Sequence, residues 1–221
     1  MPTKLGLYLM RKRARQTLRW AQSKDILEVG VGRGVFAAEA IRCGCRYMAI
    51  DCDAGALARL PEASERWNAT VPPISCGDSS RQFGAIVAEA VLEHMPSYSL
   101  AKHFILSCKD YIKPGGRLVI RCPDIMLMGP RFYHYPADHQ YPTSLPRVCA
   151  MIEDAGFVVI KAGHFIEHFT GPLAYVAWMV TWPIPLRMLH LLSGKGYHKS
   201  IWSKLGEKQP QCYIVAQKQR Q

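Results

Sequence analysis

Short apolar runs alternate with amphipathic segments along most of this chain. The runs at 25–29, 46–50 and 83–88 are largely apolar and have the length of strands buried on both faces. The segments at 35–43 and 99–112 carry apolar residues at helical spacing. This alternation predicts an α/β fold, in which a mostly parallel sheet is covered by helices on both faces.

The same pattern supplies the other elements of a seven-stranded sheet. No internal repeat and no low-complexity linker divides the chain, so we expect a single domain over residues 1–221. The glycines and proline of 113–116 predict a tight turn, and Thr143 or Ser144 can cap a helix that ends at Gly156. The remaining predicted elements are strands at 73–76, 117–121, 157–161 and 211–217, a helix at 54–60 and a loop at 123–142.

The first 22 residues predict a basic amphipathic helix, with Leu5, Tyr8, Leu9 and Leu18 apolar among arginines. The formal net charge of +11 favours an anionic partner, such as an acidic small molecule, a lipid surface or nucleic acid. No aromatic residues are interleaved with the arginines as a base-stacking platform needs, so nucleic acid is the least favoured. The alternatives are a solvated helix face, or a helix that folds over a bound cofactor and brings Tyr8 to it.

The cysteines indicate a cytoplasmic protein without a metal centre. There are eight, scattered mostly within apolar runs, and none form a Cys-x-x-Cys or a zinc-site spacing with histidine. The first residues are basic where a secretory signal would be apolar.

A glycine run, Glu28-Val29-Gly30-Val31-Gly32-Arg33-Gly34, follows the first predicted strand and leads into a helix. Free backbone N–H groups at such a helix start bind nucleotide-type cofactors, and glycine lets the cofactor lie against the backbone. Two registers are open. Gly32-x-Gly34-x-x-Ala37, with Asp51 as the ribose-binding acid, also fits the dinucleotide fingerprint of an NAD-dependent enzyme.

The acid two residues before the first glycine favours another family. With Glu28 included, the run resembles motif I of the class I S-adenosylmethionine-dependent methyltransferases. Further stretches fit that family in the same order: Tyr47–Asp51, Cys76-Gly77-Asp78, Phe83–His94 with its Leu92-Glu93-His94, and Lys113–Leu118. The resemblance covers residues 24–160 and is closest to the type 11/12 group of ubiquinone- and menaquinone-biosynthesis-like, small-molecule methyltransferases.

The resemblance implies a Rossmann-like doubly wound sheet, with S-adenosylmethionine as cofactor and S-adenosylhomocysteine as product. In the family, the motif I acid helps to hold the methionine end, the acid after the second strand takes the ribose hydroxyls, and the Gly-Asp carboxylate faces the adenine. Gly84 departs from the pattern, because an Asp is usual there. The cofactor-binding residues expected here are Glu28, Gly30, Gly32, Gly34, Asp51, Cys52, Asp78, Ala88 and Tyr8.

Methyl transfer needs alignment of two substrates and, for some acceptors, removal of a proton. His94, His134 and His139 are the candidate bases, because histidine titrates near neutral pH. Each could instead fix a loop. The sequence lacks the Asn/Asp-Pro-Pro-Tyr of amine-directed nucleic-acid enzymes, and Cys122-Pro123 reverses the Pro-Cys of pyrimidine carbon-5 enzymes.

An uncharged stretch at 169–186 lies within a predicted acceptor-side lid or insertion at 163–209, before the last strand. Its prolines interrupt a membrane-spanning helix, whereas Trp178 and Trp182 with basic flanks suit a patch that rests on a membrane surface. A buried helix is the simpler interpretation. We therefore expect methylation of a small apolar or aromatic acceptor, at oxygen rather than nitrogen or carbon. The alternatives are a lipid- or glycan-linked acceptor at a membrane, an RNA acceptor, and a non-catalytic cofactor-binding protein.

Overall fold

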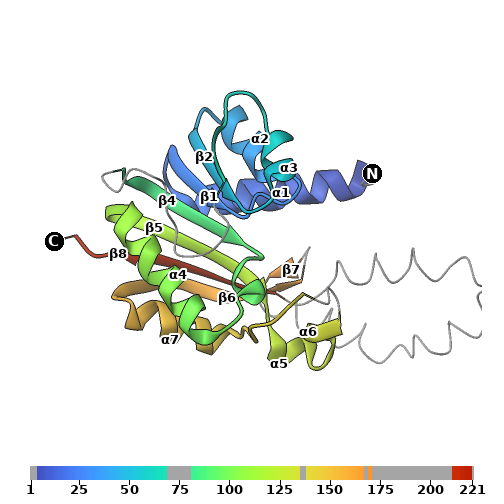
Figure 1. Ribbon diagram of the computed structural model, residues 1–221, viewed down its shortest axis with the longest axis vertical. Coiled ribbons are helices and arrows are strands. Elements are labelled where there is room, and N and C mark those ends of the chain that lie inside the picture. Colours follow the sequence, from blue (N-terminus) through green and yellow to red (C-terminus); the bar gives the residue numbers. More distant parts are fainter. Residues whose placement is uncertain (1–3, 69–80, 135–137, 167–168, 171–210, 221) are drawn as a thin grey trace, which may run out of the picture.

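The computed structural model describes residues 4–68, 81–134, 138–166, 169–170 and 211–220. In Figure 1 one twisted sheet separates two groups of helices, α1–α3 on one face and α4 and α7 on the other. The strands are β1 (Asp25–Val29), β2 (Arg46–Asp51), β3 (Glu65–Asn68), β4 (Phe83–Glu89), β5 (Ile112–Pro123), β6 (Phe157–Ile166), β7 (Phe169–Thr170) and β8 (Gln211–Lys218). The helices are α1 (Lys4–Ala21), α2 (Val35–Arg42), α3 (Ala54–Ala58), η1 (Leu92–His94), α4 (Tyr98–Tyr111), α5 (Ile125–Met128), α6 (Arg131–His134) and α7 (Leu145–Asp154).

The sheet order is β3-β2-β1-β4-β5-β8-β6-β7. Strands β1 to β5 pair in parallel, and β8 runs antiparallel to both of its neighbours. The expected Rossmann-like, mostly parallel sheet is confirmed, with the two-residue β7 added at its edge.

Successive residues of a strand belong to two separate hydrophobic cores, because side chains alternate between the two faces of a sheet. Leu27 of β1 belongs to the core under α4 and α7, with Phe104 and Ile152. Its neighbour Ile26 belongs to the core under α1, α2 and α3, with Phe36. The central strands are thus apolar on both faces, which explains why they read as nearly continuous apolar runs.

The third strand differs from the sequence prediction. The strand that pairs with the outer side of β2 is β3, Glu65–Asn68, whereas we predicted 73–76. Residues 73–76 lie outside the described residues. The polar composition of β3 explains the error, because an edge strand does not need the apolar run that marks a central one.

The predicted loop at 123–142 contains the short helices α5 and α6. Asp124, at the end of β5, organises this region. Its carboxylate accepts hydrogen bonds from the backbone of Met126 and of Leu145, which begins α7. Ser144 stands at the N-cap position of α7 but makes no side-chain cap bond, and the Thr143 hydroxyl donates to the Pro123 carbonyl instead. The cap that we expected from Thr143 or Ser144 therefore comes from Asp124.

Gly84, where the family usually has Asp, stands where a side chain does not fit. A Cβ built on it would lie 2.1 Å from Oγ of Ser23, which leads into β1.

The residues 113–116 interrupt the pairing of β4 with β5, and Gly115 has a left-handed φ of +76°. The predicted turn is therefore present as an irregularity within β5.

The predicted N-terminal helix is present as α1. Ala14, Thr17, Trp20 and Ala21 are its buried positions, whereas Tyr8 is 60% exposed. Trp20 stacks on Tyr213 of β8 with ring centroids 4.5 Å apart. Helix α1 thus packs through its second half.

Most of the predicted insertion at 163–209, including Trp178 and Trp182, lies outside the described residues. Among the helices that are described, none has the length and apolar character needed to cross a membrane.

A buried ionic network joins α1 to the ends of β4 and β5. The Glu89 carboxylate accepts hydrogen bonds from Arg13, Thr17 and Arg121. Arg121 is 1% exposed, and its guanidinium lies 3.9 Å from the ring centre of Phe165. Burial would raise the pKa of Glu89, but the two guanidiniums and the hydroxyl outweigh it and hold the pKa at about 2.

We predict that Glu89→Gln lowers the free energy of unfolding by about 3–5 kcal/mol at neutral pH, because it leaves the Arg121 charge buried without its anion. The folded-state pKa of about 2 lies below the usual 4.5, so the contribution of Glu89 is present above pH 4.5 and is lost as the pH falls towards 2. Urea unfolding of the protein and the variant at several pH values measures the difference. The exposed Glu62→Gln is the control and should change stability by less than about 0.5 kcal/mol. A difference for Glu89→Gln that does not shrink in acid would contradict this account.

Candidate functional site

The strand order reverses between β1 and β4. From β1 the chain passes through α2 to β2 on one side, and from β4 it passes through η1 and α4 to β5 on the other. Because α2 and α4 cover opposite faces (Figure 1), this topology predicts a crevice outside the carboxyl ends of β1 and β4. Ligands of open α/β sheets bind at such a reversal.

The glycine run forms the turn at the end of β1. Gly30, Gly32 and Gly34 have φ values of +77°, +50° and +70°, a left-handed conformation that side chains rarely adopt. The Gly30 amide donates to the Ile50 carbonyl at 2.8 Å, which ties the turn to β2. Gly34 then stands at the N-cap of α2.

The three glycines meet different surroundings. A Cβ on Gly30 would lie 2.7 Å from Val91, and one on Gly34 would lie 3.1 Å from Leu60. A Cβ on Gly32 would meet none of the described residues within 4 Å. Gly30 and Gly34 are therefore required by packing, whereas Gly32 borders open space against which a cofactor can lie.

Asp51, at the end of β2, hydrogen-bonds to the backbone of the glycine turn. Its two carboxylate oxygens accept hydrogen bonds of 2.8 Å from the backbone amides of Val31 and Asp53. A carboxylate can accept about four hydrogen bonds, so Asp51 keeps acceptor capacity for the predicted ribose hydroxyls. Cys52, which follows it, is exposed.

Glu28 occupies a buried position beneath the turn. It is 3% exposed, and its carboxyl group accepts a hydrogen bond from the Tyr47 hydroxyl. Burial raises the pKa of Glu28 well above its usual value, with smaller contributions from the charges of Glu89 and Asp51. Its predicted contact with the methionine end of the cofactor stays a prediction.

The other expected cofactor residues lie in different settings. Ala88 is buried at the end of β4, paired with Val29, and therefore borders the same crevice. Tyr8 is exposed in the half of α1 that extends past the carboxyl edge (Figure 1). Asp78 lies outside the described residues. The role expected for Asp78 assumed that it directly follows the third strand. That strand ends at Asn68, beside Asp51, so the residues that directly follow it begin at 69.

The chain turns sharply after β4. Ala90 has a left-handed φ of +57°, and its amide donates to the Arg121 carbonyl at 2.8 Å. A non-glycine residue in this conformation costs about 1–2 kcal/mol and often marks a functional site. The turn leads directly into η1, whose last two residues are Glu93 and His94.

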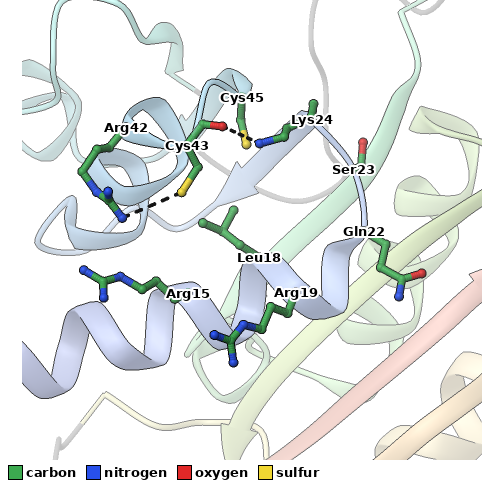
Figure 2. A pocket seen from close by; sticks show the side chains of 9 residues that line it. All are labelled: Arg15, Leu18, Arg19, Gln22, Ser23, Lys24, Arg42, Cys43 and Cys45. Carbon is green, nitrogen blue, oxygen red and sulfur yellow. Dashed lines mark hydrogen bonds between the residues drawn. The ribbon is translucent and has the colours of Figure 1, made fainter.

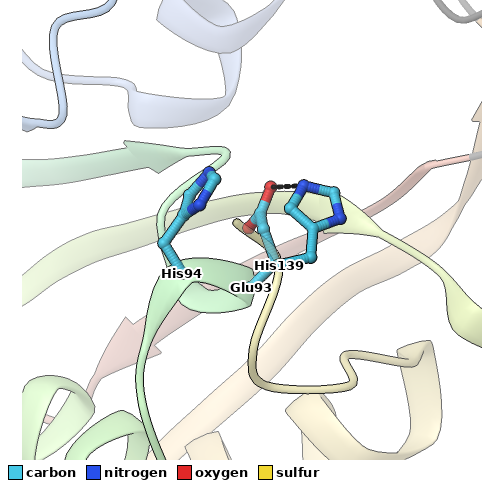
Figure 3. A group of neighbouring side chains, drawn as sticks. All are labelled: Glu93, His94 and His139. Atoms are coloured by element: carbon cyan, nitrogen blue, oxygen red, sulfur yellow. Dashed lines mark ion pairs between the residues drawn. The ribbon is translucent and has the colours of Figure 1, made fainter. Parts of the chain in front are cut away.

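Glu93, His94 and His139 form one cluster past the carboxyl end of β4 (Figure 3). Each offers a carboxylate oxygen or ring nitrogen, and these atoms lie within 4.8 Å of one another. Nε2 of His139 is 4.0 Å from Oε1 of Glu93, and the two histidine rings meet edge to face with centroids 5.1 Å apart. The backbone carbonyl of Glu93 accepts hydrogen bonds from the amides of Gln140 and Tyr141, which hold the two segments together.

Two of the three side chains are buried, and among the described residues one carboxylate oxygen of Glu93 has no hydrogen-bond partner. Glu93 is 1% exposed and His139 is 7% exposed. Burial raises the pKa of Glu93 to about 8 and lowers the pKa of His139. The three side chains could therefore exchange a proton with an acceptor or hold a cation. Glu93 was part of the Leu92-Glu93-His94 stretch, but we did not predict it as a site residue.

The side chain of one predicted base lies outside the described residues, and the structure shows a histidine–aspartate pair that we did not predict. His134 ends α6, and its side chain lies outside the described residues. Nε2 of His164, near the end of β6, lies 2.8 Å from Oδ2 of Asp124. Nothing in the sequence pointed to His164, because it stands alone within a strand far from Asp124.

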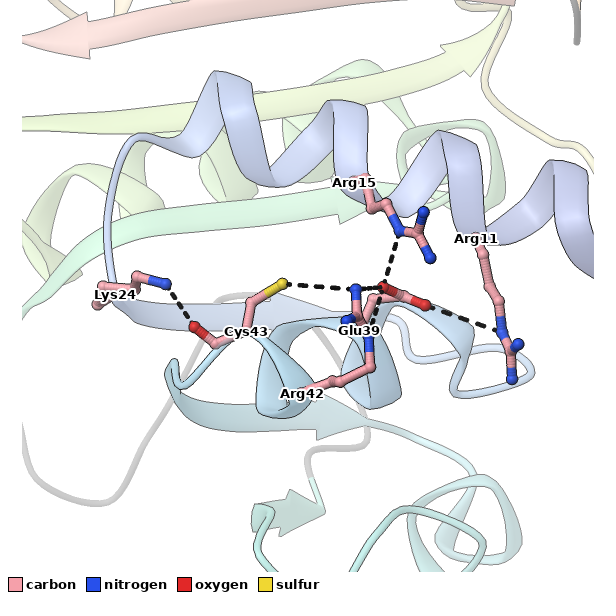
Figure 4. Close-up of polar contacts among 6 residues, drawn as sticks. All are labelled: Arg11, Arg15, Lys24, Glu39, Arg42 and Cys43. Carbon is pink, nitrogen blue, oxygen red and sulfur yellow. Dashed lines mark hydrogen bonds and ion pairs between the residues drawn. The ribbon is translucent and has the colours of Figure 1, made fainter.

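A basic hollow lies at the opposite, amino-terminal edge of the sheet (Figure 2). It has a volume of about 490 Å³ and includes Arg15 and Arg19 of α1, Lys24 before β1, and Arg42, Cys43 and Cys45 around the end of α2. Figure 4 shows Arg15 and Arg42 converging on Glu39, which is 3% exposed. Part of the positive charge is thus used to pack α1 on α2, away from the crevice.

Comparison with known proteins identifies the family. A family model described as a methyltransferase domain matches residues 4–162. The ubiquinone biosynthesis O-methyltransferase of Alkalilimnicola ehrlichii is 33% identical over 112 residues, which are 47% of this chain and 43% of that protein. The match therefore spans less than half of the relative.

Solved structures share the whole fold at low identity. A SAM-dependent methyltransferase from Archaeoglobus fulgidus has a TM-score of 0.64 at 14% identity, covering 96% of this chain and 94% of that one. The N-methyltransferase NodS from Bradyrhizobium japonicum, in complex with S-adenosylhomocysteine, has a TM-score of 0.61 at 14% identity, covering 95% and 87%. The chain belongs to the family of proteins that carry a methyltransferase domain.

Proposed function

We propose that this enzyme methylates a hydroxyl oxygen of a small apolar or aromatic acceptor, held beside Glu93, His94 and His139. The observation that carries the proposal is the position of this polar cluster. It lies at the reversal of strand order, next to the glycine turn that contains Gly32. An acceptor oxygen at the cluster would face a cofactor that lies against the turn.

Apolar side chains near the cluster support an apolar acceptor. Phe132 packs against the His139 ring with centroids 4.8 Å apart, and Tyr133 beside it is 45% exposed. Met126, at the same edge in α5, is 78% exposed. Exposed apolar groups around a few convergent polar groups are the usual composition of a small-molecule site.

The reaction is an in-line displacement at the methyl carbon. The acceptor oxygen donates an electron pair to that carbon, the carbon–sulfur bond breaks, and its electron pair returns to sulfur to give S-adenosylhomocysteine. The hydroxyl proton passes to the cluster, where neutral imidazole is a suitable acceptor. Oxygen is favoured over nitrogen because the relative with 33% identity is named an O-methyltransferase.

An RNA acceptor finds less support in the described residues. The cations of the basic hollow lie at the opposite edge of the sheet, and Glu39 already pairs with Arg15 and Arg42. A nucleic-acid acceptor would need positive charge around the crevice to hold its phosphates. The segment 169–186, for which membrane contact was the alternative to a buried helix, lies outside the described residues apart from the backbone of β7.

Matched pairs of acceptors test the proposal. The enzyme is incubated with S-adenosylmethionine and substituted phenols or with the anilines of the same shape, and S-adenosylhomocysteine and the methylated product are measured by mass spectrometry. We expect turnover of at least one phenol and none of its matched aniline. Methylation confined to anilines, or to RNA added in parallel, would overturn the assignment.

We predict that Gly32→Ala weakens S-adenosylhomocysteine binding at least tenfold, about 1.4 kcal/mol. The added methyl group enters the space that the cofactor needs, and the left-handed backbone is strained by about 1 kcal/mol. Gly44→Ala is the matched control, because Gly44 has a φ of +71° and lies at the other edge of the sheet. A Cβ built on it would meet nothing within 4 Å in the part of the chain that the structure describes. Calorimetric titration of both variants should separate strain from cofactor contact. Equal affinities in the two variants would remove Gly32 from the site.

His139→Asn and His94→Asn should each lower the rate of methyl transfer at least tenfold while leaving cofactor affinity within about twofold, because both side chains lie on the acceptor side. Single-turnover rates and calorimetry measure the two effects separately. The exposed His103→Asn on α4 is the control for the loss of an imidazole. A parallel loss of cofactor affinity would place the histidines on the cofactor side instead.

A further inference from the structure

We propose that Glu93, His94 and His139 form a binding site for one divalent transition-metal ion. The role given to the ion below rests on the proposed function, but the binding itself does not. The three side chains offer one carboxylate oxygen and two imidazole nitrogens within 4.8 Å of one another, and they come from two segments joined by backbone hydrogen bonds.

The hydrogen bonds at Nδ1 of the two histidines leave Nε2 of each ring available as a metal ligand. Nδ1 of His139 lies 2.8 Å from the Phe132 carbonyl oxygen, which can only accept, so Nδ1 carries the proton. Nδ1 of His94 lies 3.4 Å from the carbonyl oxygen and 3.3 Å from Oδ2 of Asp138. In both rings Nε2 is left with its lone pair. Metal-bound histidines are oriented in this way by carbonyl or carboxylate groups behind them.

The carboxylate of Glu93 is a second indication of a bound cation, independent of the histidines. Glu93 is 1% exposed, and among the described residues its Oε2 has no hydrogen-bond partner. A buried polar atom without a partner is costly, and a carboxylate more so. A cation bound between Glu93 and the two imidazoles would provide the missing partner.

The donor set narrows the class of metal. Two imidazoles and one carboxylate suit Fe²⁺, Mn²⁺, Co²⁺ or Zn²⁺, whereas Ca²⁺ and Mg²⁺ prefer sites built of oxygen ligands. Three protein ligands leave coordination positions open, as in catalytic metal sites. The burial of Glu93 and His139 directs those positions towards the crevice side, where His94 is partly exposed.

An open position would receive the acceptor hydroxyl. A bound cation lowers the pKa of a coordinated hydroxyl group, so its proton leaves to solvent before the oxygen attacks the methyl carbon. The ion would thus replace direct proton transfer to a histidine. In either case the carbon–sulfur bond breaks, with its electron pair retained by sulfur.

Cobalt binding tests the site without reference to activity. Protein prepared without a histidine tag is freed of metal with a chelator and titrated with Co²⁺, which is followed by calorimetry and visible absorption. We expect one equivalent to bind with the weak ligand-field bands of nitrogen and oxygen donors. Glu93→Gln and His139→Asn should each weaken binding at least tenfold, while the exposed controls Glu153→Gln and His103→Asn should bind as the parent does.

Two results would overturn the inference. One is unchanged cobalt affinity in Glu93→Gln and His139→Asn, provided that circular dichroism shows them folded. The other is an intense near-ultraviolet charge-transfer band, which would assign the ion to cysteine thiolates.

A second measurement separates this inference from the proposed function. Methyl transfer to a phenol and binding of S-adenosylhomocysteine are compared before and after chelation, and again after Co²⁺ or Mn²⁺ is restored. We expect transfer to be lost and restored while cofactor binding does not change. Full transfer by metal-free enzyme would overturn the catalytic role of the ion and leave the proposed function standing. Failure to methylate any phenol under all conditions would count against the proposed function, while the cobalt titration would still decide the metal site.

Discussion

The reversal of strand order between β1 and β4 is the constraint on which the rest of this molecule depends. It sends α2 and α4 to opposite faces, so neither of these two helices covers the carboxyl ends of the two central strands. The backbone must then turn twice in a small space. Left-handed glycines make the turn after β1, and Ala90 makes the one after β4. The first turn leaves open space at Gly32, and the second brings Glu93 and His94 to the same edge.

Two carboxylates fix these turns in place. Asp51 binds the backbone of the glycine turn, and Glu89, at the end of β4, binds α1 and Arg121 of β5. Both carboxylates are held by donors, whereas the Oε2 of Glu93 lacks one among the described residues. This contrast is the reason for placing a cation at Glu93. A methyltransferase needs rigid alignment more than chemical activation, because its cofactor already carries the reactive methyl group.

Local patterns in the sequence predicted the fold and half of the site. The glycine run, Asp51 and the central strands carry signals within a few residues, so the sequence alone was enough to place them. The edge strand β3 could not be placed in this way, because Glu65–Asn68 is polar and short. The orientation of Tyr8 depends on which helix face packs on the sheet, and the burial of Trp20 decides that. The histidines 94 and 139 were predicted separately, but their junction through Glu93 arises from tertiary hydrogen bonds that no local pattern records.

A crystal structure with S-adenosylhomocysteine tests the central claim most directly. The account predicts the cofactor along the turn at Gly32, with its ribose at Asp51 and its sulfur on the side of Glu93, His94 and His139. The adenine contact would also show whether Asp78 or the residues directly after β3 complete the site. Cofactor bound elsewhere, for example in the basic hollow at the opposite edge, or a sulfur that faces away from the cluster, would contradict the account.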